Sequence, residues 1–154
     1  QIQYYFFSSI IQDSARYQLL TKAFEIARDM FPLGTGFATF GSYYSGVYYS
    51  SVYAAYGLSN INGLRIGASQ FVSDSFWPMI LGQSGYFGLL SYILAITMLL
   101  KAIQGIRKVE NSYYAAAMCG ICYLIIVSTA ESAFVHPVAV PIAMMLGAFL
   151  GKCE

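Results

Sequence analysis

Long apolar runs separated by short polar segments dominate the second half of the chain. Residues 76–100 carry no charged side chain, and residues 113–150 carry a single one, Glu131. About 20 consecutive apolar residues are enough to cross the hydrocarbon core of a bilayer. The pattern therefore predicts transmembrane helices at residues 76–100, 113–130 and 137–154, the last one ending in a short tail, and an all-α integral membrane protein of the polytopic helical-bundle class.

The composition agrees with a membrane protein and narrows the possible partners. Of the 154 residues, 58% are apolar and 10% are charged, whereas an average soluble domain has about 45–50% and 25%. The formal net charge of +1 gives no excess of positive charge for a polyanion, so no nucleic-acid partner is expected. No Asp-x-Asp pair or histidine cluster offers a divalent-metal site, so neither a metal nor another cofactor is expected.

The orientation in the membrane is predicted from three basic residues that lie between two apolar runs: Lys101, Arg107 and Lys108. Because short cytoplasmic loops are enriched in Lys and Arg, residues 101–112 are expected on the cytoplasmic side. Residues 131–136 are then an outer turn, and residues 12–75 are a long, partly helical extracytoplasmic loop. Residues 1–11 are too short to span a bilayer but aromatic enough to be the outer end of a preceding transmembrane helix. We therefore expect a C-terminal fragment that packs against upstream helices.

Within the outer loop, residues 14–31 are predicted to form an amphipathic helix, with Asp13 as its N-cap and Pro32 as its stop. Its apolar stripe comprises Leu19, Ala23, Ile26 and Met30. Arg16 lies three residues before Leu19, so it is expected to share this stripe. It is then either a snorkelling arginine at the membrane interface or a guanidinium that needs a partner.

Six tyrosines lie between residues 43 and 56, mixed with Ser and Gly. Tyrosine at this density suits the interface of a bilayer, and a sugar-stacking surface is the alternative. Under the second interpretation, the candidate glycan contacts are Tyr49, Tyr53 and Tyr56.

Four residues of the later apolar runs have a chemistry of their own. Cys119 and Cys122 have the C-x-x-C spacing, but a metal site needs further ligands and none is nearby, so they are predicted to be small buried core residues. Glu131 and His136 lie at the outer membrane edge, where an ionisable group is a functional candidate by default. Their position in a turn favours surface exposure instead.

One constellation of residues carries a family resemblance. Asp74-Ser75 is followed by nine residues and then by Gly85-x-x-Gly88. Upstream lie Arg16, Asp29-x-x-Pro32-x-Gly34-x-Gly36-Phe37, Tyr49-Ser50 and Tyr56-Gly57-Leu58, ahead of Phe71 and Asp74. In this order the residues resemble the O-antigen ligase and polymerase family, over most of residues 14–100.

The resemblance implies a bacterial inner-membrane glycosyltransferase whose active site faces outward and which takes glycan from a polyprenyl diphosphate. Polymerases of the family join repeat units to one another, and ligases move the finished chain to another acceptor such as the lipid A core. Ligases usually have His at the position of Asp74, so Asp favours a polymerase. A flippase and a chain-length regulator are the partner proteins that such a polymerase implies, and membrane lipid surrounds it.

The chemistry of the transfer points to residue types independently of the family. Cleavage of a sugar–diphosphate bond needs a cation for the leaving group and a base for the acceptor hydroxyl. Arginine suits the diphosphate because its planar fork pairs with phosphate oxygens. The candidates are Arg16 and Arg65, then Arg28, which could instead pair with Glu25. Asp74 is the candidate base, and its alternative role is the N-cap of the helix at residue 76.

Two non-enzymatic interpretations stay open. A transporter or flippase fragment would use Glu131 and broken helices to line a pathway. However, a transporter should place ionisable groups near the middle of its spans, and residues 76–100 have none. A structural subunit with a tyrosine-rich loop would tolerate replacement of Arg16, Arg65 and Asp74.

Overall fold

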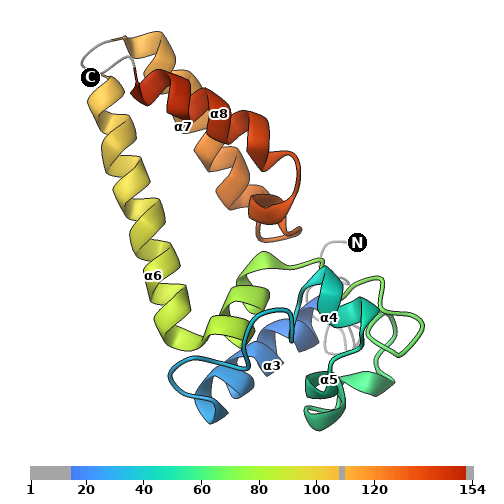
Figure 1. The fold of residues 1–154 in the computed structure, drawn as a ribbon. Helices are drawn as coiled ribbons and strands as arrows, with labels where there is room; N and C mark the ends of the chain where they lie inside the picture. The colour runs from blue at the N-terminus through green and yellow to red at the C-terminus, as the bar shows by residue number, and fades with distance from the viewer. Residues whose placement is uncertain (1–14, 108–109, 152–154) are drawn as a thin grey trace, which may run out of the picture. The chain divides into compact units, whose positions relative to one another are not determined.

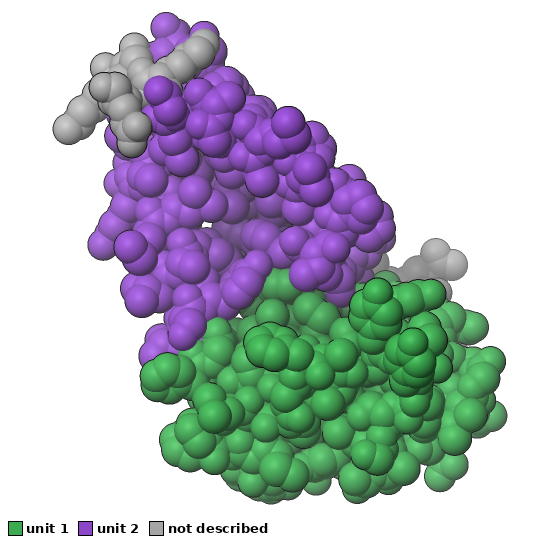
Figure 2. Space-filling view, viewed as in Figure 1, with its two compact units in different colours: residues 1–89 green, residues 90–154 purple. Residues whose placement is uncertain are grey.

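A computed structural model describes residues 15–107 and 110–151, which fall into two compact units divided between Leu89 and Leu90 (Figures 1 and 2). The described residues are mostly helical and contain no strand; their single β-bridge joins Arg65 and Ala68. The all-α prediction is thereby confirmed for this part of the chain. The predicted helix end at residues 1–11 and the cap at Asp13 lie outside the described residues.

The first described helix, α3 (Ala15–Asp29), is the predicted amphipathic helix. Leu19, Ala23 and Ile26 are fully buried, as the spacing predicts. The prediction was wrong for Met30, which is exposed because the helix ends at Asp29 and Met30 lies in the turn that follows. It was also wrong for Arg16, whose side chain is 57% exposed and lies outside the buried stripe.

The rest of the predicted outer loop packs around a hydrophobic core. Its short helices are α4 (Tyr43–Val47), which a Ser42 capping box starts, α5 (Ser51–Ala55) and the 3₁₀ turn η1 (Leu58–Asn60). The core that they share with α3 and with α6 (Phe76–Ile106) includes the fully buried residues Phe40, Tyr53, Leu58, Leu64 and Ile26. These residues form a compact unit, so the site they carry is positioned by packing.

The longest helix, α6 (Phe76–Ile106), has 31 residues and is interrupted at Gly85, whose φ of 64° and ψ of −163° are not helical. Of the helices in the described residues, it alone is long and apolar enough to cross a membrane. This finding supports membrane association. The helix continues through Lys101, so the predicted polar loop at 101–112 begins later than expected, after Ile106.

In the second unit, α7 (Asn111–Val127) is followed by the 3₁₀ turn η2 (Ala133–Val135) and by α8 (Ala139–Leu150). Helices α7 and α8 pack against each other around a core that includes Ile121 and Leu146. At 17 and 12 residues both are shorter than the predicted spans at 113–130 and 137–154, and shorter than the ~20 residues that cross a bilayer. The polytopic arrangement therefore stays a prediction.

Four residues of the second unit that the sequence singled out for their chemistry are exposed: Cys119, Cys122, Glu131 and His136. Cys119 and Cys122 were predicted to be buried, and this was wrong. The reason is that α7 buries the face that carries Ala117, Ile121 and Leu124 and leaves the cysteine side uncovered. The exposure predicted for Glu131 and His136 is confirmed.

Candidate functional site

The structure brings together two of the residues singled out for their chemistry, Arg16 and Asp74. Arg16 lies in the first turn of α3, and Asp74 lies two residues before α6 begins. The Arg16 Nη2 atom is 3.4 Å from Asp74 Oδ2, across 58 residues of sequence. Packing of α3 through Leu19 and Ile26 holds the start of this helix against the rest of the unit. The pair is therefore a product of the tertiary fold.

The pair leaves both side chains with capacity to bind. A guanidinium has five N–H donors, and the contact with Asp74 engages the Nη2 group alone. Exposed ion pairs of this kind contribute ~0.2–1 kcal/mol, so an incoming anion can compete for Arg16 at low cost. Because α6 begins at Phe76, the position directly before the helix belongs to Ser75, and Asp74 lies one residue further out. Asp74 is thus placed as an accessible carboxylate beside a cation.

The other two candidate arginines make contacts elsewhere. Arg65 donates from Nε and Nη2 to the Asn60 carbonyl, at 3.2 and 3.0 Å, and so braces the turn that precedes it. Arg28 contacts its neighbour Asp29 at 3.3 Å, and the alternative pairing with Glu25 is not formed, since Glu25 binds Lys22 at 2.7 Å. Both arginine side chains are exposed, and neither of these contacts involves Asp74.

Tyr53, a candidate glycan contact, is a core residue in this structure. Its side chain is fully buried and stacks on Phe40, with ring centroids 5.7 Å apart. Its hydroxyl accepts from the Gly41 N–H at 2.8 Å and shares a 2.7 Å hydrogen bond with Ser45. Burial raises the pKa of the Tyr53 phenol above its ordinary value. A fully buried ring offers no face to a sugar, so the prediction is wrong for this residue.

Tyr49 and Tyr56, the other two candidate glycan contacts, are half-buried. The Tyr49 hydroxyl donates to the Leu64 carbonyl at 3.0 Å. The Tyr56 hydroxyl lies 3.5 Å from Asp29 Oδ2, and partial desolvation, followed by the negative charge of Asp29, raises the Tyr56 pKa. Both rings keep part of their surface accessible, and their role in glycan binding stays a prediction.

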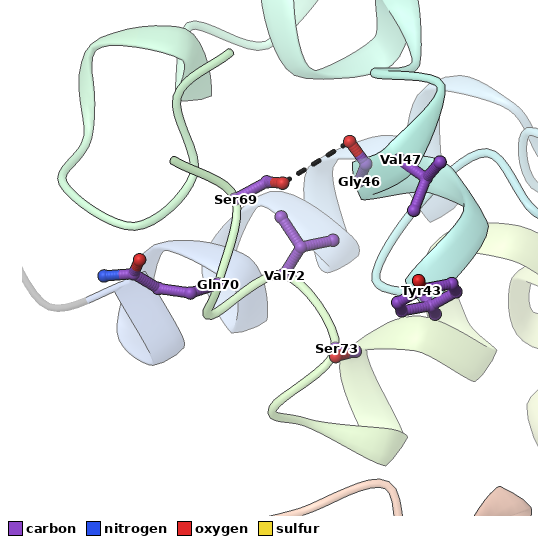
Figure 3. A pocket seen from close by; sticks show the side chains of 7 residues that line it. All are labelled: Tyr43, Gly46, Val47, Ser69, Gln70, Val72 and Ser73. Carbon is purple, nitrogen blue, oxygen red and sulfur yellow. Dashed lines mark hydrogen bonds between the residues drawn. The ribbon is translucent and has the colours of Figure 1, made fainter. Parts of the chain in front are cut away.

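A cavity of about 330 Å³ lies beside α4 and the segment that leads to Asp74 (Figure 3). It is lined by Tyr43, Gly46, Val47, Ser69, Gln70, Val72 and Ser73. A 3.4 Å hydrogen bond from Ser69 Oγ to the Gly46 carbonyl joins its two sides. The lining combines an aromatic ring, aliphatic surface, hydroxyls and an amide and contains no charged side chain, and the volume lies at the low end of the ~300–1,000 Å³ of ligand pockets.

The glycine-rich segment of the resemblance makes a backbone joint with α6. The N–H groups of Thr35 and Gly36 donate to the carbonyls of Gly82 and Gln83, at 3.0 and 2.9 Å. The close approach requires glycine, because a Cβ on Gly34 would lie 2.5 Å from the Gly82 oxygen. The joint fixes the segment after α3 to the first turns of α6, and thus braces both elements that carry the site.

Gln83 completes the joint and was not singled out from the sequence. Its buried amide donates from Nε2 to the Phe40 carbonyl at 2.5 Å and accepts from the Ala38 N–H, at 3.1 Å, through Oε1. Ala38 has a positive φ of 61°, a conformation that this hydrogen bond helps to hold. The single amide side chain in the uncharged stretch of residues 76–100 was the available signal, because a buried amide needs partners.

No family model, curated protein or solved structure matches this chain. Within the described residues, no group of three or more His, Cys, Asp or Glu is placed to hold a metal ion. Transfer without a metal or other cofactor stays a prediction. The case for a function therefore depends on the residues of the site and on their chemistry.

Proposed function

We propose that the chain is part of a membrane glycosyltransferase that polymerises polyprenyl-diphosphate-linked oligosaccharide repeat units. The products would be O-antigen, capsular polysaccharide or exopolysaccharide, made at the outer face of the bacterial inner membrane. One observation carries the proposal: Arg16 and Asp74, which the chemistry of sugar–diphosphate cleavage selects, lie 3.4 Å apart. A cation and a carboxylate in contact provide the two groups that the transfer needs at one place.

In the proposed reaction, Asp74 accepts the proton of the acceptor hydroxyl as its oxygen attacks the anomeric carbon of the donor sugar. The bond from that carbon to the diphosphate oxygen breaks, and the electron pair leaves with the diphosphate. Arg16 stabilises the charge that develops there by donating to phosphate oxygens, in place of its contact with Asp74. Arg65 and Arg28 are further candidates for the diphosphate, reached by rearrangement of their exposed side chains.

The glycan is expected to lie along the tyrosine-containing part of the same unit. Tyr49 and Tyr56 keep accessible ring surface, and the cavity beside Tyr43 ends at Ser73, the residue directly before Asp74. A wall without charged side chains suits a neutral sugar, whose hydroxyls can hydrogen-bond to Ser and Gln. Membrane lipid would surround the proposed enzyme, and its partner proteins would be a flippase and a chain-length regulator.

Two other functions predict different results. A ligase-like transferase would use the same pair but pass the glycan to another acceptor, so its product would be a single transfer. A transporter or flippase would need ionisable groups in its spans, and the part of α6 from Phe76 to Leu100 has none. The position of the pair in the loop unit favours a transferase.

The test is the length of polysaccharide made by cells that lack their own polymerase and carry this protein. We expect a ladder of repeat units from the wild type, and single repeats from Asp74→Asn at matched expression. Arg16→Lys, which keeps the charge but not the planar fork, should also shorten the ladder. Glu25→Gln is the matched control, because it removes a carboxylate of the same unit that pairs with Lys22 and not with Arg16 or Arg28.

An unchanged ladder from Asp74→Asn would remove this residue from catalysis. Absence of a ladder from the wild type, together with glycan attached to a different lipid acceptor, would favour the ligase. Absence of both products, with carrier-linked repeats accumulating on the cytoplasmic side, would favour the transporter.

A further inference from the structure

A patch of exposed apolar side chains lies on the segment that follows α3. Phe31, Leu33 and Phe37 are 71%, 66% and 88% exposed, and residues 30–40 contain no charged side chain. We call residues 31–37 the aromatic loop. Large apolar side chains that gather at a surface in this way mark a contact with a protein or a membrane.

The aromatic loop is fastened to α6 on both sides of the interruption at Gly85. On the first side, Thr35 and Gly36 donate to the carbonyls of Gly82 and Gln83, and on the second side Phe87 donates from its N–H to the Pro32 carbonyl at 3.4 Å. The Phe31 ring lies 6.4 Å from the Tyr86 ring. In Figure 1 the loop between α3 and α4 runs beside the start of α6. The loop therefore lies at the same depth relative to the membrane as this part of α6.

The environment of α6 changes at the same point. Before Gly85 the helix is covered by the first unit, since Phe76, Met79 and Leu81 are buried there. After Gly85 it exposes apolar side chains, which include Phe87, Leu90, Leu94 and Met98. The uncharged part of the helix from Tyr86 to Leu100 has 15 residues, which at a rise of ~1.5 Å each extend ~22 Å, and it is followed by Lys101, whose long side chain can reach the opposite headgroups. The surface of α6 that is open to lipid thus begins near Tyr86.

We propose that the aromatic loop rests in the outer leaflet of the bilayer, with Phe31, Leu33 and Phe37 at the boundary between headgroups and acyl chains. Bilayer lipid is the occupant because the loop is joined to the helix at the level where lipid contact starts, and because it has no charge to desolvate. Aromatic side chains are also the residues that such boundaries favour. The loop fixes the first unit at the membrane surface, and this role does not depend on the proposed enzymatic activity.

The test places a fluorescent reporter on the loop. Phe37→Trp is made in a Trp77→Phe background, which removes the single native tryptophan, and the protein is reconstituted in nanodiscs. Half of the preparations contain lipids brominated near the headgroup end of their acyl chains. Tyr48→Trp in the same background is the matched control, because Tyr48 is 81% exposed and lies outside the loop.

We expect the brominated lipids to lower the emission of the Phe37→Trp protein by roughly twofold, as for a side chain at the acyl boundary. Aqueous acrylamide should quench the Tyr48→Trp protein more strongly than the Phe37→Trp protein. Leu33→Trp serves as a second reporter on the loop. If Trp77→Phe does not fold, as judged by circular dichroism, the single variants are measured with the emission of the wild type subtracted.

Two results would overturn the proposal. Quenching at residue 37 by acrylamide but not by brominated lipid would place the loop in water. Quenching by neither would show that protein covers the loop, either another polypeptide or a second copy of this chain. In either case the ladder assay still reports on Asp74 independently, so failure of the lipid contact is distinguishable from failure of the proposed function.

Discussion

Gly34→Ala tests the joint between the aromatic loop and α6. Gly34 has a φ of +70°, and an added Cβ would lie 2.5 Å from the Gly82 oxygen and 2.7 Å from the Gly85 nitrogen. All of these neighbours are backbone atoms, so no side chain can rotate out of the way. Gly57→Ala is the matched control, because its φ is +72° and nothing lies within 4 Å of its added Cβ.

Both substitutions carry the same conformational penalty, ~1–2 kcal/mol for a left-handed residue with a side chain. Gly34→Ala adds the cost of forcing the two backbones apart, ~1–3 kcal/mol for overpacking. It also weakens the adjacent 3.0 Å hydrogen bond from Thr35 to Gly82, which contributes about 1 kcal/mol. We therefore expect Gly34→Ala to lower the free energy of unfolding by about 2–4 kcal/mol more than Gly57→Ala.

The measurement is denaturant unfolding of the detergent-solubilised protein, followed by the fluorescence of Trp77. This tryptophan lies in the second position of α6 and contacts Phe76, so it reports on the first unit. Equal losses in the free energy of unfolding would refute the reasoning, because they would show that the close backbone contact at Gly34 does not add to the cost of the side chain.

Three further predictions concern the tyrosines and the ion pair. Burial raises the pKa of Tyr53, so above about pH 10 the unfolded state loses the phenol proton before the folded state does, and the free energy of unfolding falls. Tyr53→Phe should reduce this fall when unfolding is measured between about pH 9 and 11. A double-mutant cycle with Arg16→Ala and Asp74→Ala should give a coupling energy below ~1 kcal/mol in unfolding, whereas a larger value would mark the pair as structural. Tyr43→Ala should shorten the polysaccharide ladder and Tyr48→Ala should not, because Tyr43 lines the cavity and Tyr48 does not. Ladders of equal length from the two variants would show that the cavity does not bind glycan.

The sequence predicted those parts of the fold in which periodicity and length decide the structure. The spacing of Leu19, Ala23 and Ile26 identifies the buried face of α3, because residues three and four apart share one side of a helix. An uncharged run of 25 residues similarly identifies α6. The pairing of Arg16 with Asp74 is a different case, since the need for a cation and a base pointed to both residues but not to their contact.

The remaining features depend on contacts between distant segments. Tyr53 lies in the same tyrosine-rich stretch as Tyr49 and Tyr56, and the packing of Phe40 and Leu58 around it makes it a core residue. The cavity is formed by residues 43–47 and 69–73, which the sequence alone does not bring together. Cys119 and Cys122 were misassigned because an all-apolar helix gives no periodic signal for which face is covered.

Gln83 has a consequence for how mutational scans of this protein should be interpreted. Its side-chain amide binds the backbone at Ala38 and Phe40 and so fixes the segment between α3 and α4 against α6. A helix closes its hydrogen bonds between residues four apart, so α6 does not need the outer segment in order to form, whereas the outer segment needs α6 for its placement. Substitutions at Gln83 would then abolish activity without touching a substrate. A Gln83→Glu variant that loses activity together with protease resistance would identify such a folding defect.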